Sequence, residues 1–287
     1  MAELFITKQS GEGERFDVTK LKRSLLASGA SVADVTAVLK QLTALVKPGV
    51  STAELYRRAF QLLRSIGKSY AARYSLSRAI MQLGPSGFPF EQYVAAVLEV
   101  AGYQTCTNQI FQGKCLTHEV DVVAEKPAEN IHAIIEVKFH NRPGNKTGSK
   151  DILYTHARFL DINQEWVVKR ARGAKPQGGE LQSWLFTNTK VTTDVIQYAR
   201  CAGLRITSWD YPADASFKKM IDTHLLYPIT VLLGLNADQK NQLLRARLVL
   251  CRDLLEPKNE KMIHRLGLGD RKIKLLLNEV QSLLNGV

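Results

Sequence analysis

The sequence predicts a multidomain α/β protein, with a small α+β domain at residues 1–84, a central mixed-sheet domain at residues 85–212 and an all-α domain at residues 225–287. Three observations predict this class. The 287 residues exceed the size of one typical domain. The run GPSGFP holds two prolines and two glycines, which stop a helix and mark a domain boundary. After this run helical and strand patterns alternate as far as Trp209, whereas the two flanks are mostly helical.

The composition is that of a soluble globular protein, with 45% hydrophobic and 23% charged residues. The longest apolar stretch, residues 227–235, is too short to span a bilayer, and the first residues, MAELFITK, lack the pattern of a signal peptide. We therefore expect a cytoplasmic protein with no membrane partner. The cysteines form no C-x-x-C pair, which argues against a zinc knuckle or a disulfide framework and predicts buried thiols at Cys106, Cys115, Cys201 and Cys251.

A net charge of +12 suggests a polyanionic partner such as DNA. The excess lies in the flanks: residues 1–84 carry 13 basic and 6 acidic side chains, and residues 235–287 carry 10 and 6. The residues between them are nearly balanced, with 16 basic and 15 acidic side chains.

The first domain begins with a strand in LFITK, a glycine-rich turn and a second short strand, and continues with three or four helices. Polar residues mark the helix starts. Asp17 or Thr19 is suited to cap the first helix, Ser31 the second, and Ser51 forms an S-x-x-E capping box with Glu54 for the third.

The central domain reads as αβββαβαβ. Apolar residues at helical spacing run from Phe90 to Ala101 and stop at Gly102, and a second helix is expected at residues 149–170. Two α/β alternations follow and end with the strand LRITSW. Three β-rich runs lie between the two helices, at residues 103–111, 115–124 and 131–139. This order predicts a mixed sheet with helices on both faces.

The sequence after residue 225 is helical. Asn236 with Gln239 is suited to cap one helix, and Asp270 to cap the last. Before the last helix stands the turn Leu266-Gly267-Leu268-Gly269, which gives a weak resemblance to a helix-hairpin-helix pair. In that motif backbone N–H groups bind a DNA phosphate without reading bases; simple helix packing is the alternative.

The most informative residues are Asp121 and the tripeptide Glu136-Val137-Lys138, each in a short apolar run. Side chains alternate along a strand, so Glu136 and Lys138 lie on one face about 7 Å apart. If Asp121 lies on the neighbouring antiparallel strand, the two carboxylates converge and favour a hard divalent cation. A surface ion pair on an ordinary strand is the alternative interpretation.

The sequence around these carboxylates resembles the Mrr-like type IV restriction endonucleases of the PD-(D/E)xK superfamily, over roughly residues 88–209. Four blocks carry the resemblance in order: FEQYVAAVLEVAGY as the first helix, EVDVVA and IIEVKF as the metal-binding strands, and LFTNTKVTTDVIQYARCAGLRI as the closing βαβ unit. It implies a restriction-endonuclease-like core and a metal-dependent DNA endonuclease, with a role in restriction or defence.

The resemblance assigns roles to individual residues. It implies that Asp121 and Glu136 ligate Mg²⁺ or Mn²⁺ with the carbonyl of Val137, and that Lys138 orients the attacking water and stabilises the pentavalent phosphate. Glu91 occupies the position from which some members reach the metal; a solvated helix residue is the alternative. A bound metal would lower the pKa of its water and offset charge on the scissile phosphate.

Other charged residues near the motif are weaker candidates. Glu119 shares a strand face with Asp121, whereas His118 and His140 lie on ambiguous faces, and a lone histidine is usually structural. A basic segment follows the motif and is suited either to line a phosphate backbone or to form a solvated face. Its nine basic residues, against three acidic ones, are Lys138, Arg142, Lys146, Lys150, Arg158, Lys169, Arg170, Arg172 and Lys175.

Residues 4–83 resemble the ATP-cone, a regulatory nucleotide-binding domain of ribonucleotide reductases and their repressors. The runs ITKQSGEGERFDVTKLKRSL, VSTAELY and YSLSRAI carry the resemblance. It implies that Lys8, Lys20 and Thr52 contact ATP or dATP as an effector. The chain departs from the family where K-R-D-G is typical, because it has Lys8-Gln9-Ser10-Gly11, so the resemblance also allows an assembly domain without nucleotide.

These observations predict a Mg²⁺-dependent DNA endonuclease controlled by ATP or dATP. The alternative is a non-catalytic, nucleotide-responsive DNA-binding regulator on a nuclease fold. A homodimer is compatible with an enzyme that cuts both strands.

Overall fold

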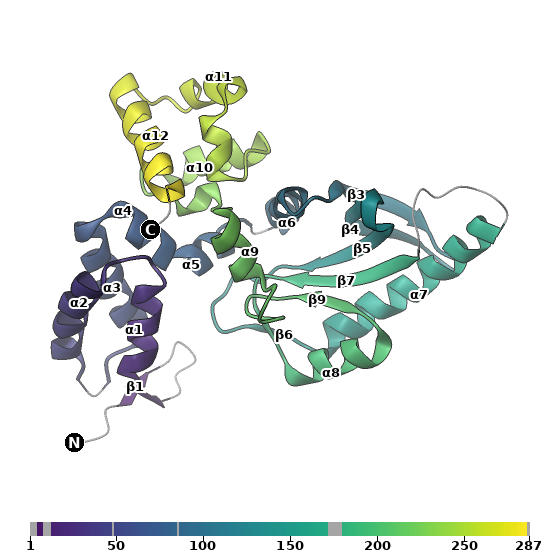
Figure 1. Cartoon of the computed structure of the whole chain (residues 1–287), viewed down its shortest axis with the longest axis horizontal. Coiled ribbons are helices and arrows are strands. Elements are labelled where there is room, and N and C mark those ends of the chain that lie inside the picture. The colour runs from purple at the N-terminus through teal and green to yellow at the C-terminus, as the bar shows by residue number, and fades with distance from the viewer. Residues whose placement is uncertain (1–4, 8–12, 48, 85, 172–179, 286–287) are drawn as a thin grey trace. The chain divides into compact units, whose positions relative to one another are not determined.

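The computed structural model describes residues 5–7, 13–47, 49–84, 86–171 and 180–285 (Figure 1). The chain divides into two compact units. One unit combines the N-terminal segment, residues 1–80, with the C-terminal segment, residues 227–287. The other unit is continuous and contains residues 81–226.

The continuous unit is built on a five-stranded sheet. Its strand order is β3-β4-β5-β7-β9, in which β3, β4 and β5 pair antiparallel and β5, β7 and β9 pair parallel. The elements are α6 (Phe88–Val100), β3 (Gln104–Gln112), β4 (Thr117–Lys126), a 3₁₀ helix (Pro127–Glu129), β5 (Ile131–Lys138), β6 (Lys146–Thr147), α7 (Ser149–Ala171), β7 (Leu181–Thr187), β8 (Lys190–Val191), α8 (Thr193–Ala202), β9 (Arg205–Thr207) and α9 (Phe217–His224).

Helices cover both faces of this sheet, as Figure 1 shows for α6 on one side and for α7 and α8 on the other. Successive residues of β7 pack in opposite directions: Leu185 joins the core under α7 and α8, while Phe186 contacts Phe217 of α9. Phe217 in turn contacts Phe90 of α6. A strand buried on both faces needs no polar alternation, which explains the apolar run of β7. The predicted mixed sheet with helices is confirmed.

Two short strands were not predicted. β6 and β8 pair in parallel over two residues each and lie outside the main sheet. Two residues are too few to give a detectable alternation of apolar and polar side chains. Their pairing nevertheless fixes Thr147 to Val191, close to the end of β7.

The other unit is mainly helical. Among its described residues, the antiparallel strands β1 and β2 precede five α-helices, and three further α-helices follow residue 227. The elements are β1 (Phe5–Thr7), β2 (Gly13–Arg15), α1 (Val18–Leu26), α2 (Val32–Leu45), α3 (Thr52–Ile66), α4 (Lys68–Tyr74), α5 (Leu76–Met81), α10 (Ala237–Arg245), α11 (Glu260–His264) and α12 (Asp270–Leu284), with 3₁₀ helices at Ile229–Val231, Cys251–Leu255 and Pro257–Asn259.

Most of the helix N-caps of this unit are the residues that the sequence predicted. Asp17, rather than Thr19, caps α1 by accepting from two backbone N–H groups, and Ser31 caps α2. Asn236 and Gln239 form the reciprocal capping box at α10. The prediction for the last helix was wrong by one residue, because Gly269 is the N-cap and Asp270 is the first helical residue.

Two further findings concern membrane crossing and thiols. None of the helices in the described part of the chain has the length and apolar character needed to cross a bilayer. The prediction of buried thiols was wrong for three of the four cysteines, because only Cys251 is buried. Cys106 lies on the edge strand β3, Cys115 in the β3–β4 connection and Cys201 on α8, and all three are exposed.

The C-terminal segment contains two turns with a residue in left-handed conformation. Gly267, between α11 and α12, has φ 68°, which glycine adopts without strain. Arg247, just after α10, has φ 60° although it carries a Cβ atom. A non-glycine residue in this region costs about 1 kcal/mol or more.

We therefore expect Arg247→Gly to raise the free energy of unfolding by roughly 0.5–1 kcal/mol, which is about 1–3 °C in Tm for a chain of this size. Relief of strain at this position outweighs the greater flexibility of glycine in the unfolded chain. Thermal unfolding followed by circular dichroism measures the change. The control is Arg245→Gly, at the exposed last residue of α10, which should lower Tm. A lower Tm for Arg247→Gly would contradict the analysis.

Candidate active site

The candidate site lies where the backbone pairing of β4 with its two neighbouring strands, β3 and β5, is interrupted. The β4–β5 register begins at Val122 opposite Ile135, so the next pair along would be Asp121 and Glu136. The β3–β4 pairing also skips Asp121, whose opposite position on β3 is Asn108. Asp121 is therefore a position in the middle of the sheet without a ladder partner on either side.

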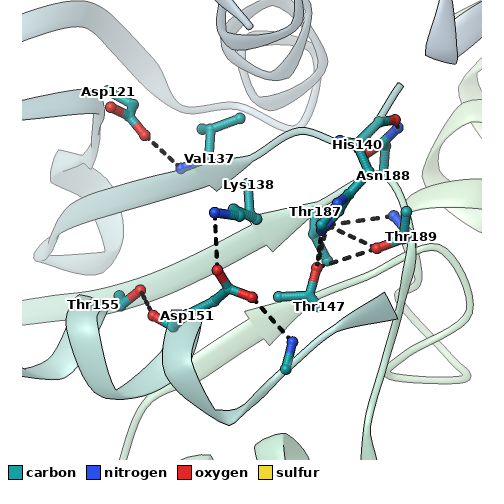
Figure 2. Close-up of polar contacts among 11 residues, drawn as sticks. Asp121, Val137, Lys138, His140, Thr147, Asp151, Thr155, Thr187, Asn188 and Thr189 are labelled. Atoms are coloured by element: carbon teal, nitrogen blue, oxygen red, sulfur yellow. Dashed lines mark hydrogen bonds and ion pairs between the residues drawn. The ribbon is translucent and has the colours of Figure 1, made fainter. Parts of the chain in front are cut away.

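The Asp121 side chain replaces part of the missing ladder. Its Oδ2 accepts a hydrogen bond of 2.7 Å from the backbone N–H of Val137, as Figure 2 shows. In an extended strand the N–H and C=O groups of one residue point to the same neighbouring strand. The carbonyl of Val137 therefore points to the same side as the Asp121 carboxylate.

Further carboxylates gather around this point. Glu91, in the first turn of α6, and Glu119, on β4, both accept hydrogen bonds of 3.2 Å from the side-chain amide of Asn108. Electrostatic repulsion links Glu91 to Asp121, Glu119 and Glu136. Carboxylates from one helix and two strands, α6, β4 and β5, thus create one region of negative charge, with the neutral Asn108 of β3 among them.

Burial and mutual repulsion make these carboxylates unusually basic. Burial, followed by the charge on Asp121, raises the pKa of both Glu91 and Glu136 to about 7. Burial also raises the pKa of Asp121, against the opposing effect of the hydrogen bond from Val137. Close to neutral pH this cluster therefore shares protons or requires positive charge from outside.

Arg158 of α7 supplies part of the compensating charge. Its guanidinium binds Glu136 Oε2, and both side chains are mostly buried. The Arg158 charge also lowers the pKa of Asp121 relative to the value that burial alone would give. A second guanidinium nitrogen binds the Tyr154 hydroxyl at 2.8 Å.

Lys138 is held on the same side of the sheet by another residue of α7. Its Nζ lies 2.9 Å from Asp151 Oδ1, and Asp151 Oδ2 accepts a hydrogen bond of 3.0 Å from the backbone N–H of Gly148 (Figure 2). Burial raises the pKa of Asp151, but the hydrogen bonds from Lys138 and Gly148 and the charge of Lys138 lower it by more. The pKa of Asp151 is therefore below its ordinary value. The Lys138 side chain is 41% exposed, so a ligand can reach its ammonium group.

A network of threonines fixes the chain beyond Lys138. Thr147 Oγ1 lies 2.9 Å from Thr187 Oγ1 and 3.1 Å from Thr189 Oγ1, and it also contacts His140 Nε2 at 3.1 Å. The Asn188 amide binds both the backbone N–H and C=O groups of His140. These bonds, drawn in Figure 2, hold the end of β5 against the end of β7.

The two histidines that flank the motif therefore differ. His140 belongs to this network, and burial lowers its pKa. His118 points instead to Asp161 of α7 at 2.7 Å. Asp161 also accepts from the backbone N–H groups of Cys115 and Leu116, so His118 and Asp161 secure the β3–β4 connection.

The structure brings the predicted residues Glu91, Asp121, Glu136 and Val137 to one place, with Lys138 beside them. It does not hold them as a formed metal cage. Among the described residues, no three His, Cys, Asp or Glu side chains have the arrangement that would hold a metal ion. The contacts give the reason, because Glu136 is engaged by Arg158 and Asp121 by the N–H of Val137.

Sequence reasoning missed Asn108 and Asp151 and counted Arg158 only as part of a basic segment. Asn108 lies opposite Asp121 in the strand register, which is a usable signal once β3 and β4 are aligned. Asp151 and Arg158 approach from α7, across a connection whose path no local pattern predicts.

A second candidate site is a cavity of about 190 Å³ in the unit that contains the N-terminal segment. The predicted residues Lys20 and Thr52 both line it, whereas Lys8 lies outside the described residues. Its remaining walls combine the aromatic rings of Tyr56 and Tyr74, stacked with centroids 5.0 Å apart, with polar and apolar side chains. These further residues are Ile6, Glu14, Arg15, Phe16, Asp17, Leu21, Ser24 and Leu55.

The fold and the first site define a mixed α/β protein with a cluster of acidic residues at an interrupted sheet. Residues 227–284 match the family described as AF1548-like, C-terminal. An uncharacterized protein of Archaeoglobus fulgidus is 37% identical over 191 residues, which are 67% of this chain and 99% of that relative. The crystal structure of the protein of unknown function AF1548 is similar with a TM-score of 0.56 and 35% identity, covering 70% of this chain and 99% of that one. The chain belongs to the AF1548-like family.

The raised carboxyl pKa values predict a dependence of stability on pH. The folded protein binds more protons than the unfolded chain between pH 4.5 and about 7, so its free energy of unfolding should fall as pH rises through this window and level off above it. Glu91→Gln keeps an oxygen that can accept from Asn108 but cannot ionise, so it should remove part of this fall, roughly 1–3 kcal/mol.

Thermal or urea unfolding at pH 5 and pH 8 tests this expectation. Glu99→Gln is the matched control, because Glu99 is an exposed residue of the same helix whose carboxylate accepts from Thr105. The control should keep the full pH dependence. A Glu91→Gln variant with the same pH dependence as the parent protein would refute the assignment.

Proposed function

We propose that this protein is a metal-dependent DNA endonuclease of the Mrr-like, PD-(D/E)xK kind, which hydrolyses phosphodiester bonds. The observation that carries the proposal is the meeting of Asp121 and Glu136 at the interrupted ladder, with Lys138 on the same strand as Glu136. Two carboxylates and an amine so arranged serve phosphoryl chemistry better than they serve stability, because the carboxylates repel each other.

The oxygen donors suit Mg²⁺ or Mn²⁺. Asp121 and Glu136, with the carbonyl of Val137, would hold the ion, and the repulsion that raises their pKa values would be relieved by it. A bound ion of this kind lowers the pKa of a coordinated water and offsets charge on a phosphate.

The residues around the carboxylates have distinct roles in this proposal. Lys138 orients the attacking water and binds the phosphate, and Asp151 positions the Lys138 ammonium group. Arg158 releases Glu136 when the site is loaded, which frees its guanidinium for a phosphate oxygen. Glu91, with its pKa of about 7, is suited to hold or accept a proton near neutral pH.

DNA is the proposed substrate because the charge distribution favours a polyanion. Of the described basic residues after Lys138, Arg142, Lys146 and Lys150 are exposed before or at the start of α7, and Lys169 and Arg170 are exposed at its end. The two flanks carry the remaining excess of positive charge. In the C-terminal segment, the turn with Gly267 and Gly269 precedes the basic start of α12. Three basic side chains are exposed there, namely Arg271, Lys272 and Lys274, while Ile273 is buried. This turn is proposed to hold a backbone phosphate.

Control by ATP or dATP is proposed for the N-terminal cavity. Lys20 offers a positive charge, Thr52 a hydroxyl at the start of α3, and the tyrosine pair aromatic surface. Lys20 is 3.2 Å from Glu14, a pair that an incoming phosphate would compete with. A cytoplasmic location and a role in restriction or defence are parts of the same proposal that rest on the sequence.

The second candidate function is a non-catalytic DNA-binding regulator that responds to a nucleotide. The Arg158–Glu136 pair favours it, because a guanidinium fixed to a metal-binding carboxylate is one way to stabilise a site that no longer acts. The two candidates differ in whether the protein cuts DNA.

We expect purified protein with Mg²⁺ to nick or cut plasmid DNA, and Asp121→Ala and Lys138→Ala each to lower the cleavage rate by roughly 100-fold or more, while most of the DNA affinity measured without divalent cation is kept. Gel analysis of plasmid over time, with a parallel binding assay, measures both. Asp222→Ala and Lys218→Ala are matched controls, since these residues lie in the same unit and form an ion pair with each other on α9.

Cleavage that survives both site substitutions would remove the site assignment. Binding without cleavage in the parent protein, at any Mg²⁺ or Mn²⁺ concentration tried, would favour the regulator.

The nucleotide proposal has a separate test. Isothermal titration should give heat of binding for ATP or dATP with the full chain, and Lys20→Ala should weaken the affinity by about tenfold through loss of one phosphate contact. Lys22→Ala, also on α1 but not among the residues that line the cavity, is the control and should bind as the parent does. Absence of heat for both nucleotides in folded protein would overturn this proposal and leave the nuclease proposal intact.

A further inference from the structure

Helix α7 has an unusual outer surface. The helix contains 23 residues and is therefore about 34 Å long. Between Leu153 and Val168 none of its exposed side chains is charged. These exposed residues are Leu153, Tyr154, Ala157, Leu160, Gln164, Val167 and Val168. A surface helix normally places its charged residues on the solvent side, so this face is suited to contact another surface.

The charged side chains of this stretch point elsewhere and have partners on this chain. Arg158 binds Glu136 and Asp161 binds the β3–β4 connection, and both are at least partly buried. Glu165 forms an ion pair with Lys169, one turn further on. Arg158 and Asp161 are thus used in contacts with the strands, and Glu165 in a pair within the helix, so none of the exposed side chains between Leu153 and Val168 is charged.

The spacing on the outer face is that of a helix-packing seam. The exposed residues Leu153, Ala157, Leu160, Gln164, Val167 and Ala171 follow one another at intervals of four, three, four, three and four residues. This is the heptad spacing by which one helix packs along another. The spacing places these residues on one face over most of α7.

We propose that α7 is the interface of a homodimer, in which this face packs against the same face of a second copy of the chain. The face is suited to a two-fold interface, because Leu160 is the central residue of Ser149–Ala171 and lies near the middle of the uncharged exposed stretch, seven residues after Leu153 and eight before Val168. A two-fold axis near Leu160 brings that residue against its own copy, whether the helices run parallel or antiparallel.

The area is sufficient for a stable dimer. Leu116 extends the face, since its backbone N–H binds Asp161 at 3.0 Å and its side chain is 65% exposed. Six large apolar side chains of this face are 40–65% exposed, namely Leu116, Leu153, Tyr154, Leu160, Val167 and Val168. Together with the smaller exposed side chains they amount to an area on the order of the ~800 Å² that each partner gives to a standard interface. DNA is a poor occupant, because the face offers no cation to a phosphate. The proposal does not depend on the proposed nuclease activity.

Light scattering during size-exclusion chromatography of the full chain, in about 0.5 M NaCl and without nucleic acid, tests the interface. One chain has a mass of 32.1 kDa, and the parent protein should have twice that mass. The double substitution Leu153→Glu with Leu160→Glu should give the single-chain mass and an unchanged circular dichroism spectrum. Leu275→Glu, at a leucine of α12 that is 54% exposed, is the matched control and should stay dimeric.

Cross-linking keeps the proposal testable if the double variant does not fold. Leu160→Cys, in a background with the exposed Cys106, Cys115 and Cys201 changed to serine, should form a covalent dimer with a short bis-maleimide, while Leu275→Cys in the same background should not. A parent protein with the mass of one chain at about 10 µM, or a folded double variant that stays dimeric, would overturn the proposal.

Discussion

Repulsion among partly buried carboxylates is the constraint on which the central part of this protein depends. Asp121 lacks a ladder partner on both sides and lies opposite Glu136, with Glu91 close by. Burial of several such groups is unfavourable unless protons, cations or hydrogen-bond donors compensate. The protein uses all three means: pKa values near 7, the guanidinium of Arg158, and the N–H of Val137.

Helix α7 supplies the guanidinium among these three means and also positions Lys138. The inner side of α7 provides Arg158 to Glu136 and Asp151 to Lys138, and its apolar residues Ile152 and Ile162 pack under the sheet. Because the polar side chains of the helix are committed inward, few remain for its outer surface. The charged site and the apolar outer face are therefore two consequences of the same arrangement, and a change in the position of α7 would affect both.

The sequence predicted the sheet and the central acids because both depend on local periodicity. Alternation along each strand was enough to place Glu136 and Lys138 on one face, and the order of elements was enough for the mixed sheet. It did not predict Asn108 or Asp151, whose contacts depend on strand register and on the path of a long connection. Exposed Cys106 was missed for a related reason, since the sequence does not say which strand lies at an edge.

The Arg158–Glu136 pair has a consequence for the proposed chemistry. Removing one partner of a buried ion pair costs about 3–5 kcal/mol, because the other charge is left uncompensated. A cation at the carboxylates would thus leave the Arg158 guanidinium in need of an anion, and a phosphate at Arg158 would leave Glu136 in need of a cation. Each ligand alone has to break the pair, whereas both together satisfy both charges. On the proposed function, metal and DNA should therefore bind cooperatively. The site would bind the cation when DNA is present, and without DNA the Arg158–Glu136 ion pair would remain intact.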